Sequence, residues 1–262
     1  MKYISGWSAM AVEPRVNPAL ERVGAMIRTI SPNRASFGRC SACTVRSLSI
    51  CGALDQADLA EFERIARQVH FAPNEALFSV GQAANSVHSL TSGVARLYKL
   101  LPDGRRQVIG FALPGDFLGT APADRYSFSA DAIDAVTACR LSREAFTHFI
   151  EHRPHFLIRI NEFATRELTM AQEQMLLLGR RTAEEKVASF LVNWRERLAQ
   201  IGDNQPTISL PMSRQDIADY LGLTIETVSR TLTRFEREKM LIIVTGGVRL
   251  LDADRAAAMA AA

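Results

Sequence analysis

Four cysteines are the side chains of this sequence best suited to hold a metal or an inorganic cluster. Three of them lie in the stretch CSACTVRSLSIC, as Cys40, Cys43 and Cys51, and Cys139 follows 88 positions later. Four thiolates match both a tetrahedral zinc site and an iron-sulfur cluster. Structural zinc usually uses two close cysteine pairs, and only Cys40 and Cys43 form one here. The spacing therefore favours a wider cluster without deciding between the two kinds of site.

The simplest alternative is that Cys139 is a small buried strand residue and that the loop thiols bind nothing. The surrounding charge argues against this, because Met1 to Ala53 contains seven Lys and Arg residues and two Asp and Glu residues. Arg39 and Arg46 are expected to lower the thiol pKa values and to offset thiolate charge. Because the loop has few apolar residues, we expect a bound metal group to supply its order.

The composition is that of a globular protein, with 47% hydrophobic and 23% charged residues and a net charge of +3. We find no run of 18 apolar residues and no secretory leader at the N-terminus. Disulfide-rich secreted domains are also smaller than this chain of 262 residues. We therefore expect reduced thiols, a cytoplasmic protein and no membrane partner.

The C-terminal region has a second pattern with a chemical function. Ser213 can cap a helix that Gly222 ends, and Thr224 can begin the next helix. Two helices joined by a three-residue turn form a helix-turn-helix, whose second helix enters the DNA major groove. The stretch LIIVTGGVRLL then predicts two short strands around Gly246 and Gly247, which would form a wing.

The outward face of the second helix has side chains that suit DNA recognition. Arginine can grip guanine, glutamate can accept from cytosine, and a hydroxyl can lie beside a thymine methyl group. Residues 211–250 contain six Lys and Arg residues and five Asp and Glu residues, so their net charge attracts DNA only weakly. Contacts to the bases must therefore contribute to DNA binding. We predict that Glu226, Ser229 and Arg230 read bases, and that Arg214 and Arg234 contact phosphates; Thr227 completes the predicted DNA-binding set. The alternative for Glu226 and Arg230 is a surface ion pair.

The intervening elements must position these two regions. The apolar spacing of LDQADLAEFERIARQVHF predicts a helix over residues 54–71. Between 71 and 141, short apolar runs separated by turns such as Asp103-Gly104 predict antiparallel strands. A β-roll or jelly roll is favoured over a parallel sheet, although periodicity does not separate it from a generic β-sandwich.

Residues 154–200 return to a helical pattern. A narrow apolar stripe, interrupted by Glu167, favours a dimerisation helix over a core helix. An unpaired carboxylate there would oppose association. Thr182 and Glu185 predict a capping box for a second helix, and IGDNQPTISLP has the composition of a linker. The predicted dimer interface is Phe156, Ile160, Phe163, Met170, Met175 and Leu178.

The sequence thus predicts an α+β chain in four parts. These are an N-terminal arm with the cysteine loop (1–53), a β-roll sensory domain (54–153), a dimerisation helix with the helix after it (154–200) and a winged helix-turn-helix DNA-binding domain (201–262).

Several motifs together resemble the Crp/Fnr family of bacterial transcription regulators. DYLGLTIETVSRTLTRFE is similar to the family's recognition segment, LPGDFLG to its β-roll signature, and QEQMLLLGRRTAEEKVASFL to the end of its dimerisation helix. Glu226, Ser229 and Arg230 match the E-x-x-S-R signature of the Fnr branch. The resemblance covers the chain from Cys40 onward and implies a cyclic-nucleotide-binding-like β-roll, a long dimerisation helix and a winged helix-turn-helix.

The resemblance also implies a cofactor and partners. Fnr-type regulators hold an oxygen-labile 4Fe-4S cluster with three N-terminal cysteines and one in the TAC stretch, which match Cys40, Cys43, Cys51 and Cys139. The C-x2-C-x7-C spacing departs from enterobacterial members and looks like α-proteobacterial Fnr-type sensors. The implied protein is a homodimeric activator that binds double-stranded DNA at TTGAT-N4-ATCAA-like palindromes, works with RNA polymerase and loses DNA binding in oxygen.

Two other functions fit the sequence less well. Cyclic-nucleotide-binding members of the family place a Glu and an Arg where this chain has Thr120 and Ser129-Ala130, so a buried phosphate would lack its charge partner. A catalytic metal enzyme is not expected, because the cysteine spacing of radical enzymes and their larger barrel are both missing. His148 and His152 are predicted to be solvated. A family member with structural zinc or no cofactor stays open.

Overall fold

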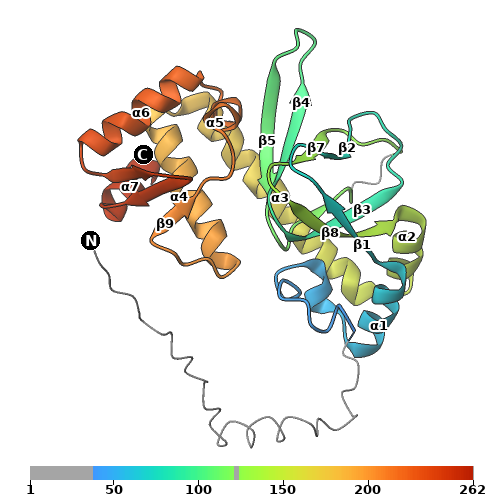
Figure 1. The fold of residues 1–262 in the computed structure, drawn as a ribbon. Helices are drawn as coiled ribbons and strands as arrows, with labels where there is room; N and C mark the ends of the chain where they lie inside the picture. Colours follow the sequence, from blue (N-terminus) through green and yellow to red (C-terminus); the bar gives the residue numbers. More distant parts are fainter. Residues whose placement is uncertain (1–37, 121–123, 262) are drawn as a thin grey trace, which may run out of the picture. The chain divides into compact units, whose positions relative to one another are not determined.

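The computed structural model describes residues 38–120 and 124–261; the arm predicted before residue 38 lies outside them. In this part of the chain, eight strands form two antiparallel four-stranded sheets, ordered β1-β8-β3-β6 and β2-β7-β4-β5. The chain passes back and forth between the sheets, which gives the predicted roll (Figure 1). The strands are β1 Arg67–Phe71, β2 Ala76–Phe78, β3 Ser86–Ser92, β4 Ala95–Leu100, β5 Arg106–Ala112, β6 Phe117–Leu118, β7 Ser129–Ala132 and β8 Val136–Ser142.

Two glycine turns shape the roll. Gly93, between β3 and β4, has φ +78°, and a Cβ there would lie 2.4 Å from the carbonyl oxygen of Ala135, so no other residue fits. Gly104 has φ +84° at the tip of the predicted β4–β5 hairpin. This hairpin extends well beyond the other strands (Figure 1).

Three short helices cover one end of the roll. They are η1 (Ile50–Ala53, a 3-10 helix), α1 (Gln56–Ile65) and α2 (Arg143–Glu151). Phe62, Phe149 and Phe156 meet there edge to face, with ring centroids 5.3 to 6.3 Å apart. The prediction of helix through Val69 is wrong, because α1 ends at Ile65 and Val69 pairs with Ala138 in the β1–β8 ladder. Strand pairing overrides the local helical spacing there.

The long helix α3 (Pro154–Arg180) is rotated relative to its predicted orientation. Phe156 is wrong as an interface residue, because it is fully buried against the chain's own core. Ile160 and Phe163 also pack on this core, and Met170 is half-buried. The exposed apolar residues at 3-4 spacing are Leu157, Ala164, Leu168, Ala171, Met175 and Leu178, which we call the α3 seam.

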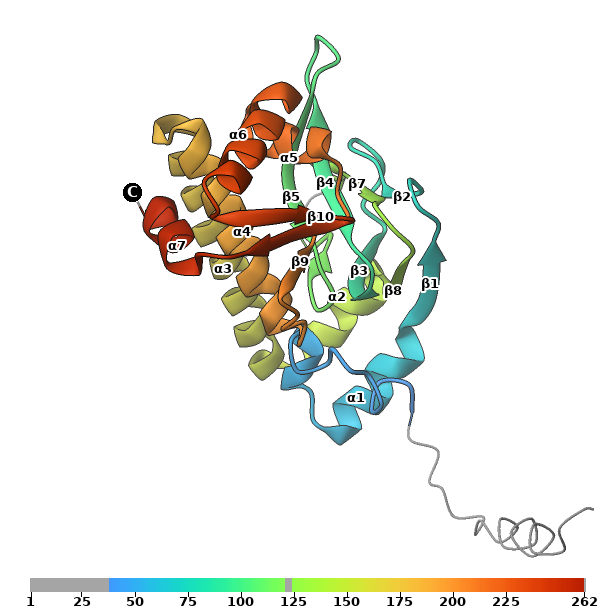
Figure 2. The same cartoon turned by 60° about the vertical axis from the view of Figure 1, so that its left-hand side comes forward.

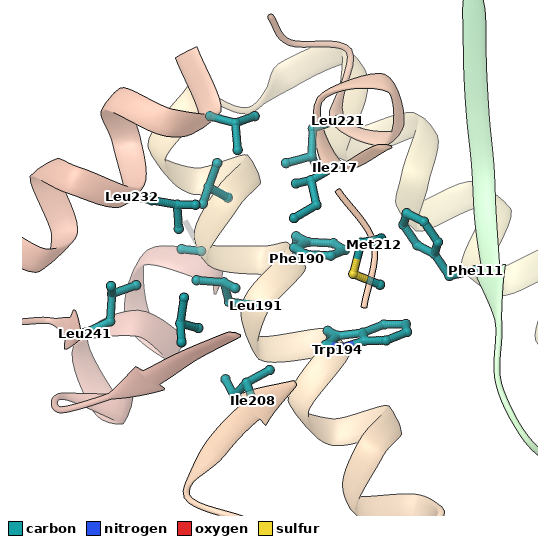
Figure 3. Packing of buried hydrophobic residues seen from close by; sticks show 14 of the residues in the cluster. Phe111, Phe190, Leu191, Trp194, Ile208, Met212, Ile217, Leu221, Leu232 and Leu241 are labelled. Carbon is teal, nitrogen blue, oxygen red and sulfur yellow. The ribbon is translucent and has the colours of Figure 1, made fainter. Parts of the chain in front are cut away.

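The helix that follows α3 packs closely with the helix-turn-helix. Helix α4 (Ala183–Gln200) starts with the predicted Thr182–Glu185 capping box and packs in one core with the helix-turn-helix, which Leu177 of α3 also joins. Figure 3 shows Phe190 of α4 next to Ile217, and Leu191 of α4 on the side of Leu241. The elements that follow are β9 Thr207–Ser209, α5 Arg214–Leu221, α6 Ile225–Arg237, β10 Leu241–Val244, β11 Gly247–Leu250 and α7 Ala253–Ala261.

The predicted wing is larger in the structure. The β10–β11 hairpin turns at Gly246, as expected, but β9 from the presumed linker pairs with β11 and makes a three-stranded sheet. Helix α7, which the sequence analysis missed, packs on α4 (Figure 2). Helix α3 ends before Arg181, whose extended backbone separates it from α4.

Candidate metal centre and nucleic-acid interface

The four cysteines meet at one cavity of about 220 Å³. Cys40 and Cys43 come from the loop of residues 38–49, Cys51 from η1 and Cys139 from β8. All four are free thiols and each is partly buried. The fold thus brings together residues that are 88 positions apart in the sequence, and β8 supplies the fixed side of the site.

The loop is held by contacts that the sequence did not reveal. Glu63 of α1 accepts hydrogen bonds from the backbone N–H of Arg39 at 2.7 Å and of Cys40 at 3.4 Å. The side chain of Ser49 accepts from the N–H of Cys51 at 3.1 Å. Val45 of the loop is also buried, so the chain itself supplies part of the contacts that hold this segment.

Burial dominates the electrostatics of the thiols. It raises the pKa of Cys40 to about 11 and that of Cys51 to about 12, and the pKa of Cys139 is raised for the same reason. Arg39 lowers the pKa of Cys40 only weakly, since its guanidinium pairs with Glu63 at 3.6 Å. Arg39 thus acts in the predicted direction on Cys40 and Cys139, but burial outweighs it, and metal binding must displace thiol protons.

The spacing of the sulfur atoms bears on which group fits. A tetrahedral zinc site with Zn–S bonds of about 2.3 Å needs thiolates about 3.8 Å apart. Among the described residues, three metal-binding side chains have ligand atoms that all lie within 4.8 Å of one another, and these are His148, Glu151 and His152. No three of the cysteine sulfur atoms lie that close together in the described structure. A polynuclear cluster with one cysteine at each corner suits the wider spacing better.

The histidine group lies elsewhere and is exposed. His148 and Glu151 of α2 approach each other to 3.9 Å, with 77% and 58% of their side-chain surfaces exposed. The prediction that His148 and His152 are solvated is confirmed.

The positions expected of a cyclic-nucleotide site do not fit a phosphate. Ser129 is buried, and its hydroxyl accepts a hydrogen bond from the N–H of Val80 at 3.0 Å. Ala130 is completely buried, and Thr120 supplies no carboxylate. A buried phosphate at this position would lack a cationic partner from these residues.

The helix-turn-helix begins and ends as the sequence predicts. Ser213 and Asp216 form a capping box, Gly222 has φ +62° after α5, and the Thr224 hydroxyl accepts from the N–H of Thr227 at 3.2 Å to start α6. Val228, Leu232 and Phe235 are buried, as predicted from the same pattern.

This packing leaves one face of α6 open. Glu226 and Arg230 are exposed, and Thr227 and Ser229 are half-buried. They do not form the alternative ion pair, since no oxygen of Glu226 lies within 4.0 Å of an Arg230 nitrogen in the described structure. The pKa of Glu226 is lowered first by a backbone N–H and then by the Thr224 hydroxyl. A surface groove continues this face and is lined by Ser229, Arg230, Thr233, Arg234 and Arg237.

The two arginines predicted to contact phosphates, Arg234 and Arg214, differ in their ion pairs. Arg234 is paired with Glu184 at 2.7 Å and with Glu238 at 2.8 Å, so a phosphate would have to compete with two carboxylates. Arg214, at the start of α5, is half-buried and has no ion pair within the described residues. Arg237, which the sequence analysis did not select, lines the groove with Arg230.

No helix of the described chain is long and apolar enough to cross a membrane.

Comparison with known proteins identifies both the roll and the helix-turn-helix. Residues 68–153 match the family profile of the cyclic nucleotide-binding domain, and residues 210–241 match that of bacterial regulatory proteins, crp family. The transcriptional activatory protein AadR of Rhodopseudomonas palustris is 66% identical over 84% of this chain and 92% of its own length. The nitrogen fixation regulation protein FixK of Bradyrhizobium diazoefficiens is 56% identical over 85% of this chain and 94% of its own.

A solved structure supports the arrangement of the domains. FixK2 from Bradyrhizobium japonicum superposes with a TM-score of 0.71 at 34% identity, covering 76% of this chain and 98% of that one. With these similarities, the roll and the winged helix-turn-helix establish that the chain belongs to the Crp/Fnr family of bacterial transcription regulators, which bind DNA and are not enzymes.

Proposed function

We propose that this protein is a cytoplasmic, oxygen-responsive transcription activator that holds a 4Fe-4S cluster and binds TTGAT-N4-ATCAA-like palindromes as a homodimer. The observation that supports the cofactor is the meeting of Cys40, Cys43, Cys51 and Cys139 at one cavity, as free thiols spaced more widely than zinc requires. Relatives described as activators support the transcriptional role.

Each part of the site has a defined task. When bound, the cluster would supply an oxygen-reactive iron-sulfur core. Cys139 of β8 provides a ligand from a rigid strand, while Cys40, Cys43 and Cys51 tie the loop to it. Glu63 orients the loop through two backbone N–H groups, so the chain already holds the loop near β8. Loss of the four sulfur bonds would leave these weaker contacts alone.

The α3 seam gives the proposed dimer its interface. Leu157, Leu168 and Met175 expose 45%, 58% and 68% of their surfaces at positions that fall on one side of the helix. An exposed apolar stripe of this kind buries itself against a second copy in a left-handed coiled coil. Two copies would then present two α6 helices to successive major grooves of a palindrome. RNA polymerase is the partner that an activator at such a site requires.

The cofactor is tested by composition. We expect anaerobically purified protein to contain about four iron and four acid-labile sulfide atoms per chain, with visible absorption. Replacing Cys139 by Ser should remove most of both, whereas Ser41→Ala, an exposed change in the same loop, should not. Zinc without sulfide, or a full cluster in the Cys139→Ser variant, would exclude this assignment.

A further inference from the structure

Two arginines of the β4–β5 hairpin reach from the roll to α5 of the helix-turn-helix. Arg96 donates to Asp216 at 2.5 Å, and Arg106 donates to the same carboxylate oxygen at 2.6 Å. Arg106 also donates to the carboxylate of Asp219 at 2.9 Å. Gln107 donates to the backbone carbonyl of Asp219 at 2.6 Å. The hairpin therefore contacts two successive turns of α5 with charged groups.

The geometry of the two strands directs the side chains of Arg96 and Arg106 toward Asp216. Arg96 and Tyr98 lie two residues apart on β4 and so face the same side of the sheet, and Arg106 lies on the neighbouring strand. Both guanidinium groups lie within 6 Å of the Tyr98 ring centre. Asp131 of β7, the cross-strand partner of Arg96, holds that guanidinium at 2.9 Å.

The network is largely shielded from water. The side chains of Asp216 and Arg96 expose 5% and 12% of their surfaces. Burial opposes the charge on Asp216, but hydrogen bonds from Ser213 and Arg96 still hold its pKa below the ordinary value. A shielded ion pair fixes the relative position of its partners, because moving one of them leaves the other charge uncompensated.

An apolar contact lies beside these ion pairs and also joins the β4–β5 hairpin to α5. Phe111 of β5 approaches Tyr220 of α5 at 5.4 Å and Trp194 of α4 at 5.9 Å between ring centres. Figure 3 shows Phe111 on its strand, facing the group of Phe190, Met212 and Trp194. Arg197 of α4 also donates to the Phe111 carbonyl at 2.7 Å.

The hairpin borders the first turn of α6, where Arg106 lines one groove with Glu226 and Thr227, but it does not bury the outward face of that helix. The hairpin binds α5, while Glu226 and Arg230 on the outward face of α6 remain exposed. The docked arrangement is therefore compatible with DNA binding, and it restricts where α6 can point.

We infer that the β4–β5 hairpin is a positioning arm, in which Arg96 and Arg106 hold α5 so that α6 is presented in a fixed orientation for DNA. A palindrome must be met by two recognition helices at a set spacing. Docking each helix-turn-helix on its own roll reduces the freedom that is lost when DNA binds, and so raises affinity. The inference assigns a role to Arg96 and Arg106, which belong neither to the cysteine site nor to the predicted DNA-binding set.

Charge reversal at Asp219 distinguishes the positioning of α6 from general electrostatic attraction between the protein and DNA, because the two effects change DNA affinity in opposite directions. Asp219→Arg places a second cation beside Arg106 and breaks the contact, although the added positive charge by itself favours DNA. Asp103→Arg is the matched control, since it makes the same charge change at the exposed hairpin tip, away from α5. We expect Asp219→Arg to bind a palindrome about tenfold more weakly than Asp103→Arg under anaerobic conditions.

A charge swap and a spectroscopic signal complete the test. Arg106→Glu should also weaken binding, and the double variant Arg106→Glu/Asp219→Arg should recover most of the affinity. In a Trp7→Phe background, emission reports Trp194 alone, and it should shift to longer wavelength in each single variant but not in the swap. Equal or tighter binding by Asp219→Arg than by Asp103→Arg would overturn the inference.

The result can be separated from failure of the proposed cofactor. Iron content and dimer mass are measured on every variant, and only variants that match the parent in both are compared. Should Asp219→Arg fail to fold, Arg106→Gln is compared with Lys99→Gln, which removes one exposed positive charge from β4 of the same hairpin. Weaker binding by Arg106→Gln alone supports the positioning arm, and equal binding by the two overturns it.

Discussion

At the scale of single residues, Arg230 and Arg214 are expected to recognise DNA in different ways. Arg230 lies exposed on the open face of α6, where it can grip a base edge. Arg230→Ala should weaken palindrome binding by about 1–3 kcal/mol and relax discrimination at one base pair, with little effect on random DNA. Arg214→Ala should weaken binding to both DNAs alike. Titrating both variants with both DNAs checks this, and uniform weakening by Arg230→Ala would contradict a base-reading role.

His88 predicts a pH dependence of stability. Its ring is 1% exposed in the roll, its Nδ1 has no hydrogen-bond partner among the described residues, and burial lowers its pKa from 6.5 to about 4. Because the folded state excludes the proton, the stability that His88 contributes is complete above pH 6.5 and is lost as the pH falls towards 4. The loss should approach roughly 3 kcal/mol. Urea unfolding of the cluster-free protein at several pH values measures it, and His88→Phe should lose less stability over this range.

Single residues also mark the limit of what the sequence could predict at the cysteine site. The four cysteines themselves were identified from their type and spacing. Glu63 was not, because a carboxylate in an amphipathic helix gives no sign that it will accept two N–H groups from a loop 23 and 24 residues away. The direction of the thiol pKa values was also wrong, since burial depends on the packing of α1 and β8 around the loop.

At the scale of elements, capping residues predicted helix ends well. Ser213, Gly222 and Thr224 act within a few residues of themselves, so the helix-turn-helix could be predicted in detail. The orientation of α3 could not, because its pattern contains two apolar faces and only the folded roll determines which one is covered. Phe156 is buried by Phe62 and Phe149, which come from two other helices. The packing of helix α4 against the helix-turn-helix could not be predicted for the same reason.

The corrected α3 seam makes its own prediction. Leu168→Glu should convert the dimer to a monomer, because it places a charge in the proposed apolar contact. Palindrome affinity should then fall by about 100-fold, as the two half-sites are no longer bound together. Thr169→Glu, an exposed change about 100° around the helix, is the control and should stay dimeric. Sedimentation equilibrium gives the mass, and a dimeric Leu168→Glu protein would contradict the seam.

At the scale of the whole molecule, the cysteine loop and the DNA-binding domain are linked by packed elements. Leu48 of the cysteine loop packs on the turn before β6, where a Cβ at Gly115 would meet it at 3.0 Å. The next residue, Asp116, pairs with Arg197 of α4 at 2.6 Å. The loop is thus two contacts away from the DNA-binding domain. This proximity gives a physical basis for a change at the cysteines to alter DNA binding.

The most direct measurement is a titration of TTGAT-N4-ATCAA DNA with anaerobically purified protein, repeated after exposure of the same sample to air. We predict tight binding before exposure and at least tenfold weaker binding afterwards, together with loss of visible absorption and of the dimer. A Cys139→Ser protein should bind weakly under both conditions. Equal affinity before and after air, in a sample that has lost its cluster, would contradict control of DNA binding by the four cysteines.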